Sequence, residues 1–326
     1  MNGLALVPVR RLVFERPRIR VALVPGDRIV AIVGSAVAAG DLLAERVRDP
    51  RLVETDDADR HAAPAHPGAW VAAEPGRHGT APAGELIFEH GGRRRIATGP
   101  HPDLVAAPAA GRVAAIHPGV DIVLELDGIG IPGSELLGDP GHGRLALLPG
   151  DGETRLPLDV ARAGSVVVFP GRVDAETLTR ARAMGIAGAV VAALAERDRR
   201  DVVASEARQR AGLHRLPPFP VLVLDGYLRR TLASPVRDVL AALEGTEVGL
   251  AGGPPMLVAL AGAPLPRPPE GHVRVRGGPH AGREGRFVRL AGPHRLGAGV
   301  TVEAARVVLD GGHPAVVALG DLERFA

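Results

Sequence analysis

Arginine side chains that could contact phosphate are concentrated near the end of this 326-residue sequence. Residues 271–300 contain six arginines and one glutamate, and a guanidinium group can donate two parallel hydrogen bonds to a phosphate. We therefore predict a nucleic-acid contact in this segment. The residues assigned to it are Arg274, Arg276, His280, Arg283, Arg286 and Arg289.

Other interpretations of this segment stay open. Its arginines alternate with apolar residues, which is typical of a sheet with one solvated face, and Phe287 alone gives no platform on which bases could stack. Arginine also replaces lysine throughout the chain and the net charge is only +2, so the arginine content is weak support for nucleic acid. A contact surface for a protein, or a purely structural sheet, are the alternatives.

A second group of polar residues follows two apolar runs in the middle of the chain. The runs at 165–169 and 221–224 predict parallel strands, and ligands gather at the carboxyl ends of such strands. An arginine there could bind an anion, and an aspartate could act as a general base or bind a ribose. Against this, acidic residues begin the next helix and disfavour phosphate, and Asp-Gly after a strand is typical of a turn. The candidates for this alternative ligand site are Gly171, Arg172, Asp225 and Gly226.

The composition excludes several classes of chemistry. The sequence contains no cysteine and no lysine, which excludes a Walker-type phosphate lysine, a Schiff base, a cysteine nucleophile, a thiolate zinc site and an iron–sulfur cluster. No histidines have HxH, HExxH or HxxxH spacing, and the acidic stretch at 56–61 lacks the turn that a hard cation needs. We expect no catalytic residue, no metal ion and no cofactor.

One stretch, Gly128–Gly133, fits the G-x-G-x-x-G spacing of dinucleotide-binding loops. Such a loop must open a helix whose first amides bind the pyrophosphate. Pro132 removes one amide, and the residues at 134–141 are too few and too rich in glycine and proline to form that helix. We predict a cluster of turns here.

The elements that must position these residues fall into three parts. Valine-rich runs broken by turns at intervals of about 8 to 12 residues predict a β-rich region over 1–160, with a helix at 41–47 and a long loop at 61–84. Strands that alternate with helices predict a parallel α/β layer over 161–262. Four prolines among residues 263–269 predict an extended spacer at 263–270, and residues 271–326 should then form a separate unit.

Helix limits in the α/β layer carry their own signals. Asp174 is a good N-cap and Gly185 a good C-terminal stop for a helix over 174–184. Ser234 followed by Pro235 predicts an N-cap and a first-turn proline for the helix at 234–243. A further helix is expected at 197–211.

The stretch from Val273 to Val288, with its Gly277-Gly278-Pro279 turn and later glycines Gly282 and Gly285, is similar to the KOW motif of bacterial transcription elongation factors and some ribosomal proteins. The resemblance covers about 55 residues and implies a small SH3-like barrel, because its tight turns need glycine. An RNA or protein partner is what the resemblance implies.

The stretch from Val24 to Leu43 resembles the hairpins of lipoyl and biotinyl carrier domains, and residues 108–116 look like a second copy. This resemblance implies a barrel-sandwich fold in the N-terminal region. Carrier domains attach their cofactor through a lysine, which this chain lacks, so the carrier function is not implied.

We therefore expect an α/β plus β protein: a barrel-sandwich-like region, a parallel α/β layer and an SH3-like barrel. No apolar run reaches the roughly 18 residues needed to span a bilayer, and we expect a cytoplasmic location and no membrane contact. The function expected is a non-catalytic adaptor or assembly module that presents β-barrel surfaces to a protein or RNA partner. The alternative is a small-molecule-binding protein or enzyme at the strand ends of the α/β layer.

Overall fold

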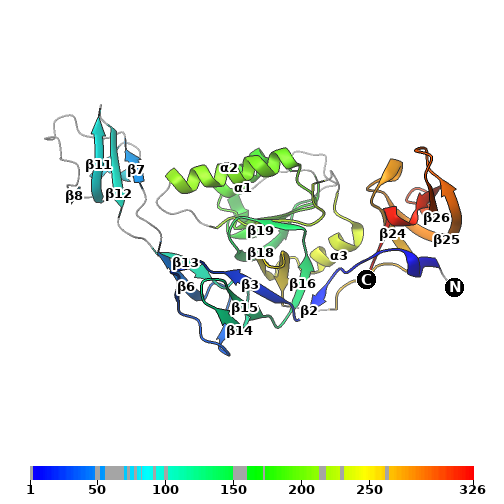
Figure 1. The fold of residues 1–326 in the computed structure, drawn as a ribbon, viewed down its shortest axis with the longest axis horizontal. Helices are drawn as coiled ribbons and strands as arrows, with labels where there is room; N and C mark the ends of the chain where they lie inside the picture. Colours follow the sequence, from blue (N-terminus) through cyan, green and yellow to red (C-terminus); the bar gives the residue numbers. More distant parts are fainter. Residues whose placement is uncertain are drawn as a thin grey trace.

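The computed structural model describes residues 3–47, 52–55, 70–71, 74–76, 79–81, 83–90, 93–98, 102–149, 160–171, 173–212, 218–227, 231–260 and 264–326. In these parts the chain is rich in strands, which form mixed sheets, and it has three α-helices (Figure 1). None of these helices combines the length and apolar character needed to span a bilayer.

A nine-stranded sheet occupies the middle of the molecule, and β18 to β21 are its parallel strands. The remaining pairs are antiparallel. In spatial order its strands are β17 (Glu135–Leu137), β21 (Val221–Val223), β20 (Gly188–Val191), β19 (Ser165–Phe169), β18 (Gly141–Leu147), β22 (Glu247–Ala251), β23 (Met256–Ala259), β16 (Ile129–Pro132) and β2 (Phe14–Glu15).

Helices cover both faces of this sheet, because neighbouring residues of a strand point to opposite sides. Val167 and Phe169 of β19 pack in one core with α1 (Ala175–Ala183) and α2 (Glu196–Gly212). Val166 and Val168 pack in another core with α3 (Ser234–Ala242). The alternation of strands and helices predicted within residues 161–262 is therefore found. The layer is not wholly parallel, because β22 lies antiparallel beside β18 and α3 is not a parallel crossover.

Two details of the helix limits can be compared with the sequence. The Asp174 carboxylate accepts the Thr177 N–H at 2.8 Å and caps α1, and Gly185 has a φ of 81° where that helix ends, so both predictions are confirmed. Ala233, and not Ser234, is the N-cap residue of α3, so that prediction is wrong by one position.

Three expectations for the first 160 residues are wrong. The segment at 41–47 forms the strand β6 (Leu42–Val47), and the segment at 128–133 forms β16 rather than turns. The expected loop at 61–84 contains the strands β8 (Trp70–Val71), β9 (Glu74–Gly76) and β10 (Gly79–Ala81). Strands β2, β16, β17 and β18 also join the nine-stranded sheet, so the boundary between residues 160 and 161 falls inside one sheet.

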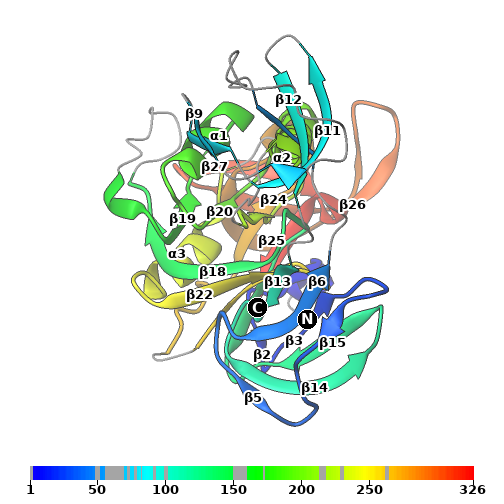
Figure 2. The same ribbon diagram turned by 90° about the vertical axis from the view of Figure 1, so that its left-hand side faces the viewer.

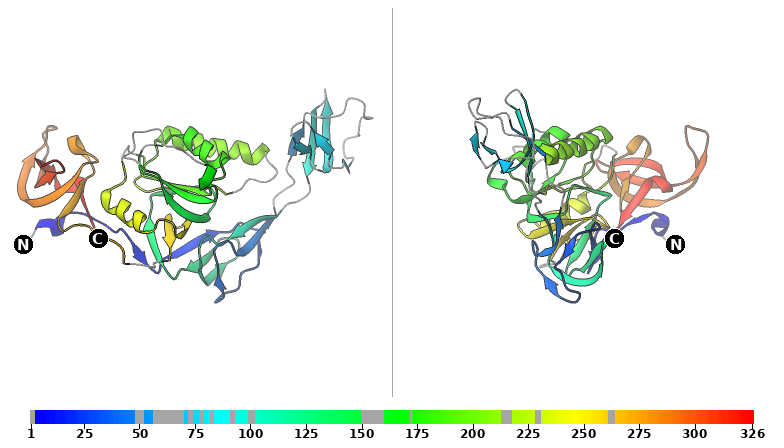
Figure 3. Two further views of the ribbon diagram at one scale, coloured as in Figure 1. Left: turned by 180° about the vertical axis from the view of Figure 1, so that it is seen from behind. Right: turned by 60° about the vertical axis from the view of Figure 1, so that its left-hand side comes forward.

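Two smaller sheets lie beside the nine-stranded sheet and share a core that includes Ile19, Leu43, Val113 and Ile122. A four-stranded sheet of residues 52–98 stands away from them (Figure 1; Figure 3, left). The first small sheet contains β3 (Arg18–Ala22), β15 (Asp121–Glu125), β14 (Gly111–His117) and β5 (Ala36–Val37), and the second contains β13 (Pro102–Ala106), β6 (Leu42–Val47) and β4 (Arg28–Ile29). The outlying strands are β7 (Leu52–Thr55), β12 (Arg93–Thr98), β11 (Gly84–His90) and β8 (Trp70–Val71), with the separate pair β9 (Glu74–Gly76) and β10 (Gly79–Ala81).

Both ends of the chain meet in one six-stranded sheet, which we call the terminal sheet (Figure 3). The segment before β1 packs into its core through Val7, and β1 pairs in parallel with β28. The described strands leave this sheet open, since no ladder joins β27 to β1. Its strands are β1 (Val9–Arg10), β28 (Leu322–Phe325), β24 (His272–Val275), β25 (Glu284–Arg295), β26 (Thr301–Leu309) and β27 (His313–Ala318).

The described residues also contain four 3-10 helices: η1 (Gly3–Leu6), η2 (Val160–Arg162), η3 (Gly278–His280) and η4 (Leu319–Asp321). Residues 264–269 form neither helix nor strand. Leu265 in this segment packs against the core that contains α3, and Phe325 of the terminal sheet belongs to that same core. The terminal sheet is therefore packed against the α/β layer and is not a unit held away from it by a spacer.

Candidate nucleic-acid interface

Two residues that the sequence placed in different sites bind each other. Arg274 is fully buried, and its Nη1 lies 2.8 Å from Oδ2 of Asp225, two residues after the end of β21. Its Nη2 donates to the carbonyl of Thr231 at 2.9 Å, and Arg10 pairs with the other oxygen of Asp225. Glu323 completes the cluster, 3.6 Å from Arg274. Neither a phosphate nor a ligand can reach these two groups, so both site predictions are wrong for Arg274 and Asp225.

Of the other three residues predicted for the ligand site at the strand ends, the structure describes the two glycines. Gly171 is buried, and Gly226 lies in a turn with a φ of 79° whose carbonyl accepts the Leu194 N–H. Arg172 lies outside the described residues, as do the acidic residues at 56–61. Elsewhere in the described chain, no group of three or more histidine and acidic residues is arranged to hold a metal ion.

A second polar contact between the terminal sheet and the α/β layer is centred on Glu284. Its carboxylate accepts hydrogen bonds from the N–H and the hydroxyl of Ser234. A residue of the terminal sheet therefore caps the first turn of α3. His272 Nε2 lies 3.2 Å from the same carboxylate. Burial alone would raise the pKa of Glu284, but the neighbouring His272 and the hydrogen bonds from Ser234 outweigh it, and the pKa lies below its ordinary value.

This capping contact predicts a pH-dependent stability. Because the pKa of Glu284 is lowered by folding, its contribution is present above the ordinary pKa of a glutamate and is lost as the pH falls through the lower folded pKa. We expect Glu284→Gln to lower the free energy of unfolding by about 1 kcal/mol at neutral pH. Urea unfolding between about pH 3 and pH 7 should show this difference shrinking at the acid end. Glu303→Gln, at an exposed position, is the control; a difference for Glu284→Gln that stays constant with pH would contradict the assignment.

The other predicted arginines remain at the surface, in different states. Arg276 lies 3.7 Å from Glu323, and Arg283 donates to the carbonyl of Asp310 at 3.1 Å. His280 is half-buried on η3. Arg286 and Arg289 are exposed on β25 and form no ion pair or hydrogen bond with any part of the chain that the structure describes.

Sequence reasoning missed the arginine that faces them. Arg306 on β26 is exposed between buried Ala305 and Val307, and it lies directly opposite Arg289 in the ladder. The alternation of Arg306 with apolar neighbours was the signal that could have found it. We call Arg286, Arg289 and Arg306 the basic face. Like charges directly across an antiparallel pair destabilise a sheet, so an anion bound between Arg289 and Arg306 would stabilise it.

The shape of the terminal sheet presents this face to solvent. The register shifts at Val288, so that Phe287 opposite Val307 points into the core while Arg289 pairs with Arg306 on the outside. The β25–β26 hairpin extends beyond the rest of the sheet (Figure 2). Phe287 is only 6% exposed, so its ring is not available for base stacking, and the exposed ring of β25 is the imidazole of His294 near the end of the strand.

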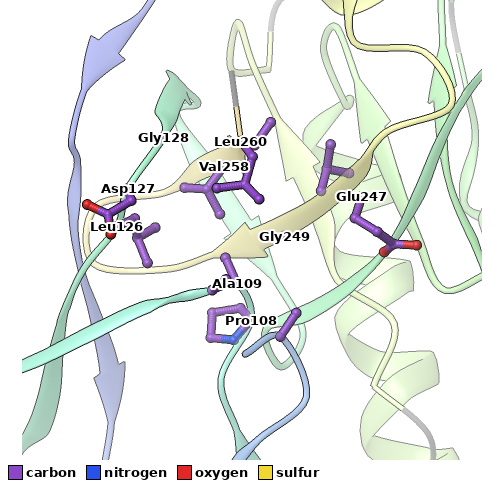
Figure 4. A pocket seen from close by; sticks show the side chains of 13 residues that line it. Pro108, Ala109, Leu126, Asp127, Gly128, Glu247, Gly249, Val258 and Leu260 are labelled. Atoms are coloured by element: carbon purple, nitrogen blue, oxygen red, sulfur yellow. The ribbon is translucent and has the colours of Figure 1, made fainter. Parts of the chain in front are cut away.

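Two hollows elsewhere in the described chain do not have facing arginines like those of the basic face. A cavity of about 70 Å³ between the small sheets and the β22–β23 hairpin has apolar walls such as Ala109 and Val258, with the carboxylates of Asp127 and Glu247 at its two ends (Figure 4). A cleft of about 740 Å³ lies at the amino ends of β18 and β20. That is the edge opposite to the one where we expected a ligand, and its polar side chains are His142, Thr179 and Arg182.

No protein-family model matches the sequence, and no curated protein matches it either.

Proposed function

We propose that the protein is a non-catalytic adaptor whose terminal sheet holds RNA through the phosphate backbone. The observation that carries this proposal is the exposed pair Arg289 and Arg306, which face each other across β25 and β26 without a carboxylate partner among the described residues. The resemblance of residues 273–288 to KOW motifs supports RNA over other polyanions. The proposal is non-catalytic because Asp225, the residue suggested as a general base, is held in ion pairs with Arg10 and the buried Arg274.

The same geometry favours contact with phosphates over contact with bases. Guanidinium groups on a sheet face can bind phosphates of a duplex without reading its sequence. Stacking would need exposed aromatic rings, and the basic face has none. We therefore propose that the face binds structured RNA largely independently of its sequence.

Salt dependence tests the proposal directly. Fluorescence anisotropy with an RNA duplex of about 16 base pairs should show affinity that falls as KCl rises from about 50 to 200 mM. The double variant Arg289→Gln/Arg306→Gln should lower the slope of log affinity against log salt by about one for each phosphate that the protein no longer neutralises. Salt enters this slope because each phosphate that the protein neutralises releases counterions into solution, and this release is less favourable at high salt.

The matched control removes two exposed arginines from helices, Arg200→Gln/Arg237→Gln, and should leave that slope unchanged. Absence of RNA binding at low salt would end the proposal. So would an equal loss of slope in the control, because binding would then follow total charge. Tighter binding of poly-glutamate than of RNA would identify an acidic protein as the partner instead.

A further inference from the structure

A hollow of about 400 Å³ lies beside the basic face. Arg286 belongs to the basic face and also lines the hollow. It is formed by three segments that are distant in sequence: residues 269–272, the start of β25, and the end of β26 with the turn that follows it. The inference drawn from it rests on the proposed function, because it concerns the RNA that the basic face would bind.

Glycines keep the hollow open. A Cβ at Gly285 would lie 2.3 Å from the carbonyl oxygen of Val308, so this position on the lining has no side chain. Gly311 and Gly312 form the turn at its edge with φ values of 88° and 82°, a conformation that disfavours any other residue. Three of the ten residues that line the hollow are therefore glycines, and at these positions a flat group could approach the backbone closely.

The polar side chains around the hollow are of opposite sign and are not paired with each other. Glu270 and Asp310 are exposed, and their carboxylates form no hydrogen bond or ion pair with the described residues; Asp310 engages Arg283 only through its backbone carbonyl. Arg286 is likewise without a partner in the described chain. His272 also lines the hollow, but its Nε2 lies beside Glu284.

Guanine is the base whose edges match this set of groups. Its O6 and N7 are two adjacent acceptors, which suit the two parallel donors of an arginine. Its N1–H and N2–H are two adjacent donors, which suit the two oxygens of a carboxylate. Adenine and uracil have neither of these matched pairs, and cytosine has two adjacent acceptors but no two adjacent donors.

We propose that this hollow takes a single unpaired guanine of the RNA bound on the basic face. Arg286 binds the O6 and N7 edge, and the carboxylate of Glu270 or Asp310 accepts the N1 and N2 hydrogens. The rest of the RNA stays on Arg289 and Arg306, so recognition combines a backbone contact with one base-specific contact.

The experiment compares three RNAs that share one duplex: fully paired, with a single bulged guanine, and with a single bulged uracil. The native protein should bind the guanine bulge about tenfold more tightly than the uracil bulge. The variant Glu270→Gln/Asp310→Asn should lose this preference and still bind the paired duplex with an unchanged salt slope. The control Glu247→Gln/Glu303→Gln, which removes two exposed carboxylates elsewhere, should keep the preference.

The outcomes separate this inference from the proposed function. Equal affinity for the two bulges, together with salt-dependent binding of the duplex, would overturn the guanine site and leave the proposed function standing. Absence of binding to all three RNAs would overturn both. Binding of guanosine monophosphate as tight as that of the bulged RNA would show that the hollow takes a free nucleotide, which overturns RNA as the source of the base.

Discussion

Asp225→Asn should lower the free energy of unfolding by about 3 to 5 kcal/mol, the range found when one partner of a buried ion pair is removed. Asp225 bonds to Arg10 and Arg274, and Arg274 is fully buried. Without the carboxylate, the counter-charge left to Arg274 among the described residues is Glu323, at 3.6 Å. Chemical denaturation of the full chain measures the loss. Because the cluster joins the terminal sheet to the α/β layer, we expect the terminal sheet to become accessible to protease first.

The control for this prediction is an ion pair at the surface. Glu45→Gln breaks the contact with Arg28, whose side chain is 69% exposed, and should change stability by less than about 1 kcal/mol. Adding Arg274→Met to Asp225→Asn should restore part of the stability, because the buried guanidinium that has lost its hydrogen-bonded carboxylate is then gone. An Asp225→Asn variant as stable as Glu45→Gln would show that the cluster does not hold the two sheets together.

The elements that the sequence predicted well are those whose signals are local. Strand β19 has the predicted limits, since it is a β-branched run with a glycine just before it and a proline just after it. Asp174 caps α1 through a contact only three residues away. These features depend on neighbours in the sequence and can be predicted without the rest of the fold.

The errors arise where distant partners decide. The segment at 41–47 has a helix-favouring composition, but its pairing with β13 and the burial of Leu43 and Ala44 make it a strand. The sequence gives no sign that Val9–Arg10 pairs with β28, more than 300 residues later. Two parallel strands that are so far apart in the sequence are not joined by a turn, and no spacing of residues marks them as partners.

The candidate site was predicted only in part for the same reason. Arg274 and Arg289 occupy similar alternating patterns, yet one is buried against Asp225 and the other faces solvent. The difference is set by which side of the terminal sheet packs on the α/β layer. Arg306 was missed because its position opposite Arg289 is a property of the ladder and not of the segment that contains it.

Gly249→Ala should destabilise the protein by about 3 kcal/mol, at the upper end of the cost of forcing an extra group into a packed interior. A Cβ at this position would lie 2.0 Å from the carbonyl oxygen of Pro108, where the segment after β13 crosses β22 (Figure 4). Pro108 cannot yield easily, because the neighbouring Ala107 donates its N–H to Asp41 at 2.8 Å and accepts the Gly40 N–H at 2.7 Å. Thermal and urea unfolding of the variant measure the cost.

Gly252→Ala is the matched control, three residues away on the same hairpin. There the nearest atom to a new Cβ is the Leu136 side chain at 3.7 Å, an ordinary contact, and the backbone has no positive φ. The control should therefore change stability by less than about 1 kcal/mol. If both variants behaved alike, the small sheets would not pack on β22 as closely as the structure places them. A loss confined to Gly249→Ala would establish this crossing as a rigid seam between the small sheets and the nine-stranded sheet.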